Sequence, residues 1–445
     1  MEPFHISSSI PTATAPYWTD MDPRIWSRLP QRLMDRTIAC LPPPAFFRAR
    51  AVCKRWYALL FSNAFLQLYL QASPRHHYFI FFRQQQQQQH HHPSLRSCCI
   101  YSRDSSSSST SDHHHHRRHF QAQEGYLFDP DNLKWYRIPF PLIPPGFSPA
   151  SSSGGLVCWV SDDSSTGSKR ILLCNPVTGA FSSSSQPQLL QLPSTLRPRL
   201  CPSMGMSITA SSIDVVFAGD DLISPYAVKN LTSESLHVDG AGFYSIWGTT
   251  APLPRLCSLD SGGGMVHVRG RFYCMNYSPY SVLAYDVSRN GWSKIQAPMR
   301  RFLRSPSLVE SRGKLVLVAA VEKSKLNVPR SLRMWALQEE EEERAWVEVE
   351  RMPQRLYSEF AEMEAGRGFR CAGQGEVLLL MLPDTRALVF HTRTKRWVWA
   401  PPCPHRAAAH TEQQHLLQGF AYEPRLAVPV TPLLQQLQLT PRPSS

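Results

Sequence analysis

Residues 126–138 read YLFDPDNLKWYRI, in which a polar turn joins an apolar strand to a second strand that opens with an aromatic residue. The pattern returns along the chain, for example as VLAYDVSRNGWSKI at 282–295 and as ALVFHTRTKRWVW at 387–399. Short runs rich in aromatic and β-branched residues, separated by turn residues, are typical of β-hairpins. We therefore predict that most of the chain is mainly β and is built from repeats.

The spacing of these hairpins predicts the architecture. The residues that mark the second strand are 46, 55, 56, 54 and 51 positions apart, in the order Trp135, Phe181, Leu236, Trp292, Trp346 and Trp397. A repeat of about 50 residues that contains strand pairs is typical of a kelch-type β-propeller. We expect a propeller over residues 77–430, with six blades favoured over seven, and a tail at 431–445.

The first repeat supplies only three strands, HYFIFF, YLFDP and KWYRI. We expect a strand near residues 419–424, GFAYEP, to complete that blade, because closing the ring pairs strand edges that would otherwise be free. Residues 83–124 interrupt the same blade with runs of Gln, His and Ser, a composition that predicts a disordered insertion. Residues 1–20 are predicted to be a disordered leader.

Charge, cysteine usage and hydropathy limit the class of protein. The 47 Lys and Arg against 34 Asp and Glu give a net charge of +13, which favours partners with negative surfaces. The 11 cysteines include no Cys-x-x-Cys pair and no secretory signal is evident, so we expect a reducing compartment. Apolar runs such as 377–382 are far shorter than the roughly 20 residues that cross a bilayer, and no membrane contact is expected.

No motif for catalysis or metal binding emerges. The nucleophile elbow, the phosphate-binding loop and the zinc-protease motif are all missing from the sequence. A copper oxidase site on a propeller would need convergent His, Tyr and Cys ligands, whereas His237, His267 and His391 stand alone in strand-like stretches. The histidine runs of the insertion lack the Cys/His spacing of a closed metal site. We expect a non-catalytic protein without cofactor or metal.

Residues 21–74 have a helical period instead. Apolar residues recur at helical spacing from Leu29 to Leu70, and Pro42, Pro43 and Pro44 separate at least two helices. A unit of about 45 residues buries only around 60% of its unfolded surface, yet this one has apolar residues on more than one face of each helix. We expect it to complete its core against another molecule; the alternative is a cap packed on the rest of the chain.

The order and spacing of LPQRL (29–33), Ile38, LP (41–42) and VCKRW (52–56) resemble an F-box. The resemblance implies a three-helix module that docks on a Skp-family adaptor and so joins a cullin ubiquitin ligase. Phe46 and Phe47 stand where that family more often has Leu. We interpret Trp56 as a buried anchor with Lys54 and Arg55 at its solvated edge. The docking and core surface implied by the resemblance consists of Leu29, Pro30, Leu33, Ile38, Leu41, Pro42, Val52, Cys53, Trp56 and Leu59.

One face of the propeller is expected to be basic. Because the strands of a blade alternate in direction, the loops after its second and fourth strands lie on the same side. The residues expected on such loops are Arg300, Arg301, Arg304, Lys323, Lys325 and Arg330. This face could hold an acidic segment of a protein partner or contact nucleic-acid phosphates, and the alternative is a merely solvated surface.

Longer stretches, such as MDPRIWSRLP (21–30) and FYCMNYSP (272–279), resemble the plant F-box proteins of the Unusual Floral Organs and Fimbriata type. The resemblance implies a substrate receptor of a Skp-cullin-F-box ligase that also acts as transcriptional cofactor of a Leafy-type factor in floral and inflorescence meristems. It implies a nuclear location, together with a cytoplasmic pool. A competing hypothesis is a co-regulator whose basic propeller face contacts DNA beside its partner, independently of ubiquitination.

Overall fold

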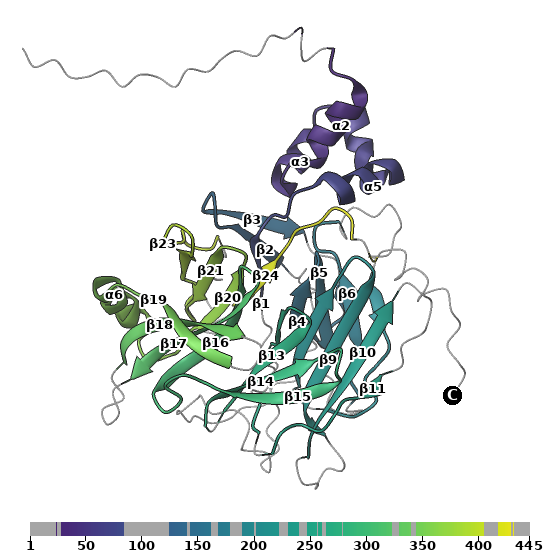
Figure 1. Cartoon of the computed structure of the whole chain (residues 1–445). Coiled ribbons are helices and arrows are strands. Elements are labelled where there is room, and N and C mark those ends of the chain that lie inside the picture. The colour runs from purple at the N-terminus through teal and green to yellow at the C-terminus, as the bar shows by residue number, and fades with distance from the viewer. Residues whose placement is uncertain are drawn as a thin grey trace, which may run out of the picture. The chain divides into compact units, whose positions relative to one another are not determined.

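The computed structural model divides into two compact units, residues 1–73 and residues 74–445 (Figure 1). The first unit is helical and the second is made of β-sheets. The structure describes Arg24 and residues 28–83, 124–139, 143–161, 168–178, 189–199, 202–221, 230–239, 247–255, 257–259, 264–277, 279–322, 329–339, 344–404, 417–428 and 430. The leader 1–20, most of the insertion at 83–124 and the tail 431–445 lie outside the described residues.

Prolines and small polar side chains set the helix boundaries of the first unit. Pro30 and Pro42 precede the first two helices, where their fixed φ suits the helix start. The side chains of Cys53 and Ser62 accept hydrogen bonds from the backbone N–H groups of Trp56 and Phe65, which caps the next two. The helical elements are α2 (Gln31–Ala39), α3 (Pro43–Arg50), α4 (Lys54–Ala58), the 3₁₀ turn η1 (Leu59–Phe61) and α5 (Asn63–Ala72).

Aromatic residues form the centre of the helical unit. Phe46 is fully buried and stacks on Phe65, with 5.8 Å between ring centroids, while Phe47 meets Phe46 edge to face at 5.6 Å. Tyr69 of α5 and Ile38 of α2 are also buried. A phenylalanine at position 46 therefore fills the small core by stacking on α5.

Six four-stranded antiparallel sheets make up the second unit, and each is one blade of a β-propeller. The expectation of six blades is confirmed. Blade 1 consists of β24 (Leu417–Tyr422), β1 (Tyr78–Arg83), β2 (Glu124–Asp129) and β3 (Lys134–Pro139), and blade 2 of β4 (Phe147–Ser153), β5 (Leu156–Ser161), β6 (Ile171–Cys174) and β7 (Leu190–Leu192). Blade 3 consists of β8 (Ser203–Ile208), β9 (Ser212–Asp221), β10 (Asn230–Asp239) and β11 (Gly248–Thr249), and blade 4 of β12 (Val266–Val268), β13 (Arg271–Asn276), β14 (Ser281–Asp286) and β15 (Gly291–Gln296). Blade 5 consists of β16 (Leu303–Ser311), β17 (Lys314–Glu322), β18 (Pro329–Glu339) and β19 (Arg344–Arg351), and blade 6 of β20 (Arg370–Gln374), β21 (Val377–Met381), β22 (Ala387–His391) and β23 (Arg396–Trp399).

The strand β24 closes the ring. It pairs with β1 from Tyr78 opposite Tyr422 to Arg83 opposite Leu417, so blade 1 combines strands more than 300 positions apart in the chain. The hydroxyl of Tyr422 donates to the backbone oxygen of Gly155 in blade 2 at 3.3 Å. The edge of β1 that would otherwise be open is therefore paired.

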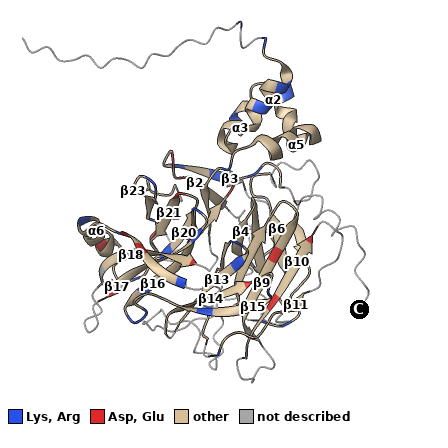
Figure 2. Cartoon of the chain, viewed as in Figure 1, with Lys and Arg blue, Asp and Glu red and all other residues tan. Residues whose placement is uncertain are grey.

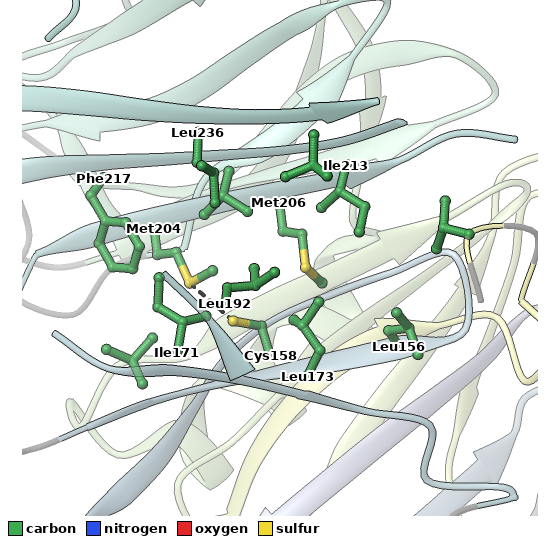
Figure 3. Packing of buried hydrophobic residues seen from close by; sticks show 14 of the residues in the cluster. Leu156, Cys158, Ile171, Leu173, Leu192, Met204, Met206, Ile213, Phe217 and Leu236 are labelled. Atoms are coloured by element: carbon green, nitrogen blue, oxygen red, sulfur yellow. Dashed lines mark hydrogen bonds between the residues drawn. The ribbon is translucent and has the colours of Figure 1, made fainter. Parts of the chain in front are cut away.

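Apolar residues fill the space between consecutive blades. Between blades 2 and 3, Cys158 and Leu173 face Met204, Met206 and Phe217 (Figure 3), and the thiol of Cys158 lies 3.7 Å from the sulfur of Met204. Strands such as β5 and β6 are buried along their whole length, because a sheet in the ring is covered on both faces. Their sequences consequently read as continuous apolar runs rather than as alternating ones.

Tryptophans in or beside the outer strands of blades 1, 3 and 5 donate hydrogen bonds to the blade before. The indole N–H of Trp135 in blade 1 donates to the oxygen of Pro401 after blade 6 at 2.8 Å, and that of Trp346 in blade 5 donates to Gln296 at 2.8 Å. In blade 3 the corresponding residue is Trp247, which donates to Pro193 at 3.0 Å. The choice of Leu236 as the marker of that repeat is wrong, because Leu236 lies inside the ten-residue third strand β10.

A helix, α6 (Gln354–Glu364), lies in the connection between blades 5 and 6. Tyr357 and Phe360 are its buried apolar residues and pack with the core between these two blades. The sequence reasoning missed α6. Its signal was Leu356, Tyr357, Phe360 and Ala361 at helical spacing within a chain region otherwise made of strands.

Candidate docking and recognition surfaces

The helical unit exposes an unusual number of large apolar side chains. Leu33 is 50% exposed, Val52 68%, Tyr57 56% and Phe61 50%. The described part of the propeller exposes four more, Leu196, Met299, Val347 and Val349. The propeller unit has 372 residues, whereas the helical unit has 73. Exposed apolar side chains gathered on a small unit indicate a surface that a partner covers. We name Leu33, Val52, Tyr57 and Phe61 the apolar surface of the helical unit.

Arg50 holds two of these aromatic rings in place. Its guanidinium carbon lies 4.5 Å from the ring centre of Tyr57 and 5.6 Å from that of Phe61, and its Nε donates to the backbone oxygen of Tyr57 at 3.1 Å. Arg50 is itself almost fully buried. A cation stacked on both rings limits their rotamers before any partner arrives, which lowers the entropic cost of binding.

The structure separates the F-box residues predicted from the sequence into three groups. Pro30, Leu33, Val52 and Cys53 are exposed, and Leu29, Leu41, Pro42 and Trp56 are partly exposed. Ile38 and Leu59 are 4% and 6% exposed, so they belong to the core of the unit and are not available to a partner in this conformation. Ile38 and Leu59 therefore form the core part of the predicted docking and core surface.

Trp56 also differs from its prediction. It is partly exposed in the chain by itself rather than buried, and no residue of α4 is buried. Its neighbour Arg55 forms an ion pair with Asp35 of α2 instead of only facing solvent. The sequence reasoning missed Tyr57 and Phe61; their signal was an aromatic pair four positions apart, which places both on one side of a helical turn.

The predicted basic face is only partly described. Arg300 and Arg301 are exposed in the turn between β15 and β16. In this turn the backbone N–H of Phe302 donates to the backbone oxygen of Met299 at 2.8 Å. Lys323 and Lys325 lie outside the described residues, and Arg330 is the second residue of β18. Over the described blades, basic and acidic residues are interspersed (Figure 2). The exposed basic turn of Arg300 and Arg301 is the part of this face that the structure places.

Arg304 does not belong to that exposed turn. It lies in β16, and its guanidinium forms ion pairs with Glu364 of α6 and, at 3.4 Å, with Glu322 of β17. Glu364 is buried and also accepts the backbone N–H groups of Gly366 and Gly368. The charge of Arg304 is thus matched by two carboxylates and fastens α6 to blade 5, so its assignment to a partner-facing loop is wrong.

The described residues also bear on metal binding and membrane insertion. Across the described ranges, no group of three or more His, Cys, Asp or Glu side chains is arranged to hold a metal ion. The three histidines singled out from the sequence lie in strands, His237 in β10, His267 in β12 and His391 in β22. Among the helices that the structure describes, none is long and apolar enough to cross a membrane.

Fold and surface together define an F-box protein with a six-bladed β-propeller. The family profile of the F-box domain matches residues 26–68, and that of the KIB1-4 β-propeller matches residues 127–357. As an F-box protein, the chain is a non-catalytic substrate receptor of a Skp-cullin-F-box ubiquitin ligase.

Comparison with known proteins narrows the class to a family. The chain is 54% identical over 426 residues to Protein UNUSUAL FLORAL ORGANS of Arabidopsis thaliana, which covers 94% of this chain and 89% of the relative. It is 42% identical over 448 residues to Protein ABERRANT PANICLE ORGANIZATION 1 of Oryza sativa subsp. indica, with 95% and 94% covered. The chain belongs to the plant F-box proteins of the Unusual Floral Organs type.

Proposed function

We propose that the apolar surface of the helical unit is the contact with the Skp-family adaptor, and that the propeller holds the client. The observation that carries this proposal is the concentration of Leu33, Val52, Tyr57 and Phe61 on so small a unit. Joining both partners to one chain raises the effective concentration of the client's lysines near the ubiquitin-conjugating enzyme. The cullin then binds through the adaptor.

Adaptor binding by the full-length chain tests this proposal. Val52→Asp places a charge at a side chain that is 68% exposed, so we expect it to abolish binding of a purified Skp-family adaptor without unfolding the unit. The matched control is Val347→Asp, because Val347 is another exposed valine, in β19 of the propeller. Normal adaptor binding by Val52→Asp, or equal loss by Val347→Asp, would contradict the assignment.

A second activity is supported by the basic turn and by the relatives. The Arabidopsis and rice relatives are named for floral organs and panicle organization. We propose that the chain also acts in the nucleus as transcriptional cofactor of a Leafy-type factor in floral and inflorescence meristems. In that complex, Arg300 and Arg301, with Lys323, Lys325 and Arg330, would add DNA phosphate contacts to those of the partner.

Reporter activation with a Leafy-type factor separates the two activities. If the cofactor role is independent of ubiquitination, deletion of residues 21–70 spares activation, while Arg300→Glu with Arg301→Glu destroys it. Arg304 is left unchanged, because its replacement would also break the ion pairs with Glu322 and Glu364. Loss of activation by the deletion alone would favour the ligase as the route to transcription.

A further inference from the structure

A hollow of about 530 Å³, lined mainly by residues with polar or charged side chains, lies between blades 3 and 4. Blade 3 contributes Ser207 and Asp214, and blade 4 contributes His267, Arg269, Arg271 and Arg289. The turns that line it follow the first and third strands of a blade, whereas the basic turn of Arg300 and Arg301 follows a fourth strand. Because strands alternate in direction, the hollow opens on the side of the propeller opposite that basic turn.

Two of the three arginines of the hollow keep their charge available. Arg271 is used within the chain, since it binds Asp286 at 3.0 Å and Glu339 at 2.8 Å. Arg269 and Arg289 are exposed, and within the described ranges neither guanidinium forms an ion pair. Over the described ranges, two unmatched cations therefore border a hollow in which Arg271 is paired with Asp286, and Asp214 lies 2.6 Å from Nδ1 of His237.

Short turns fix the backbone positions of these two arginines. Arg269 and Gly270 have φ of 49° and 79° and form the two-residue turn between the paired residues Val268 and Arg271. The backbone N–H of Arg289 donates to the carboxylate of Asp286 at 3.1 Å. Both side chains thus project from rigid hairpin turns rather than from long loops, which limits the ordering needed on binding.

Neutral hydrogen-bonding groups complete the lining. The hydroxyl of Ser207 lies 3.1 Å from Nδ1 of His267, which orients the imidazole. Burial lowers the pKa of His267, so at neutral pH the ring offers a hydrogen bond without a charge. The volume of the hollow lies within the roughly 300–1,000 Å³ that is usual for ligand sites.

We propose that this hollow binds an acidic peptide segment whose Asp or Glu carboxylates pair with Arg269 and Arg289. The inference rests on the proposed client-receptor function and names the chemistry of a bound segment. A peptide suits the hollow better than a nucleic acid, because two separate guanidiniums match isolated carboxylates rather than a continuous row of phosphates. Isolated carboxylates can reach the two guanidiniums that form no ion pair within the described part of the chain, while a backbone group can hydrogen-bond to the imidazole of His267.

Fluorescence anisotropy with the full chain bound to its adaptor tests the proposal. The probe is a labelled peptide of alternating Glu and Gly, and its Gln counterpart is the neutral reference. Arg269→Asn with Arg289→Gln removes both charges, and Asn tolerates the left-handed backbone at position 269. We expect the Glu peptide to bind the double variant at least about tenfold more weakly than it binds the wild type. We expect the Gln peptide to bind the wild type more weakly than the Glu peptide by the same factor.

Arg300→Gln is the matched control, since it removes an exposed arginine from the other side of the propeller, and we expect less than about a twofold change from it. Equal weakening by Arg300→Gln, no binding of the Glu peptide, or binding only of a phosphoserine peptide or a DNA duplex would overturn the proposal. Adaptor binding is measured on the same samples. Its retention by the double variant shows that a failure here leaves the proposed function standing.

Discussion

Phe46→Ala should unfold the helical unit while the propeller stays folded. Phe46 is fully buried and stacks on Phe65 of α5, so its removal takes away the contact that joins α3 to α5. A buried Phe→Ala change costs about 3–5 kcal/mol. The helices of this unit, from Gln31 to Ala72, comprise roughly 40 residues and have about 2–6 kcal/mol of stability in total, at roughly 0.05–0.15 kcal/mol per residue. The change therefore removes most or all of the stability of the unit.

Hydrogen exchange on the full-length chain measures this directly. A loss of about 3 kcal/mol corresponds to roughly a hundredfold loss of protection, since each 1.4 kcal/mol is tenfold. We expect that loss for the amides of α2 and α5. Amides of the buried propeller strands β13 and β17 should keep their protection, because the two units are separately compact.

Val52→Ala provides the control within the same unit. At 68% exposure its side chain contributes little to the core, so stability should change by less than about 0.5 kcal/mol while adaptor binding weakens. The reasoning fails if Phe46→Ala leaves α5 protected, or if β13 and β17 lose protection together with it.

Three other changes test the propeller. Trp135→Phe removes the indole donor to Pro401, and we expect a loss of about 1 kcal/mol in urea unfolding of the propeller, with normal adaptor binding. Arg199→Met leaves the buried carboxylate of Glu234 unpaired, which should cost about 3–5 kcal/mol, and Glu234→Gln added to it should recover part of that cost. Burial opposes ionisation of Asp286, but hydrogen bonds from neighbouring hydroxyl, guanidinium and backbone groups lower its pKa to about 2 from 3.8. Its stabilising effect is present above pH 3.8 and is lost as the pH falls towards 2, so the wild type and Asp286→Asn should differ in urea midpoint at pH 6 and converge near pH 2.

Local patterns in the sequence were sufficient for the architecture. The hairpins around Trp135, Trp292 and Trp397 and the spacing between them led to a six-bladed propeller. The motif from Leu29 to Trp56 led to the F-box. These features depend on neighbouring residues, because side-chain alternation and turn chemistry act over a few positions. The short outer strand after Trp247 was not predicted, because a strand of two residues has almost no sequence pattern of its own.

Exposure and charge pairing were decided only by the tertiary structure. Arg304 and Glu364 are 60 positions apart, and their ion pair forms because α6 packs on blade 5, which no local pattern in either stretch shows. Likewise, within the described part of the chain the guanidinium of Arg269 forms no ion pair and that of Arg271 forms two, although two positions separate these residues. The local sequence determines which segments form strands. The partners of a side chain depend instead on which distant turns the closed ring brings together.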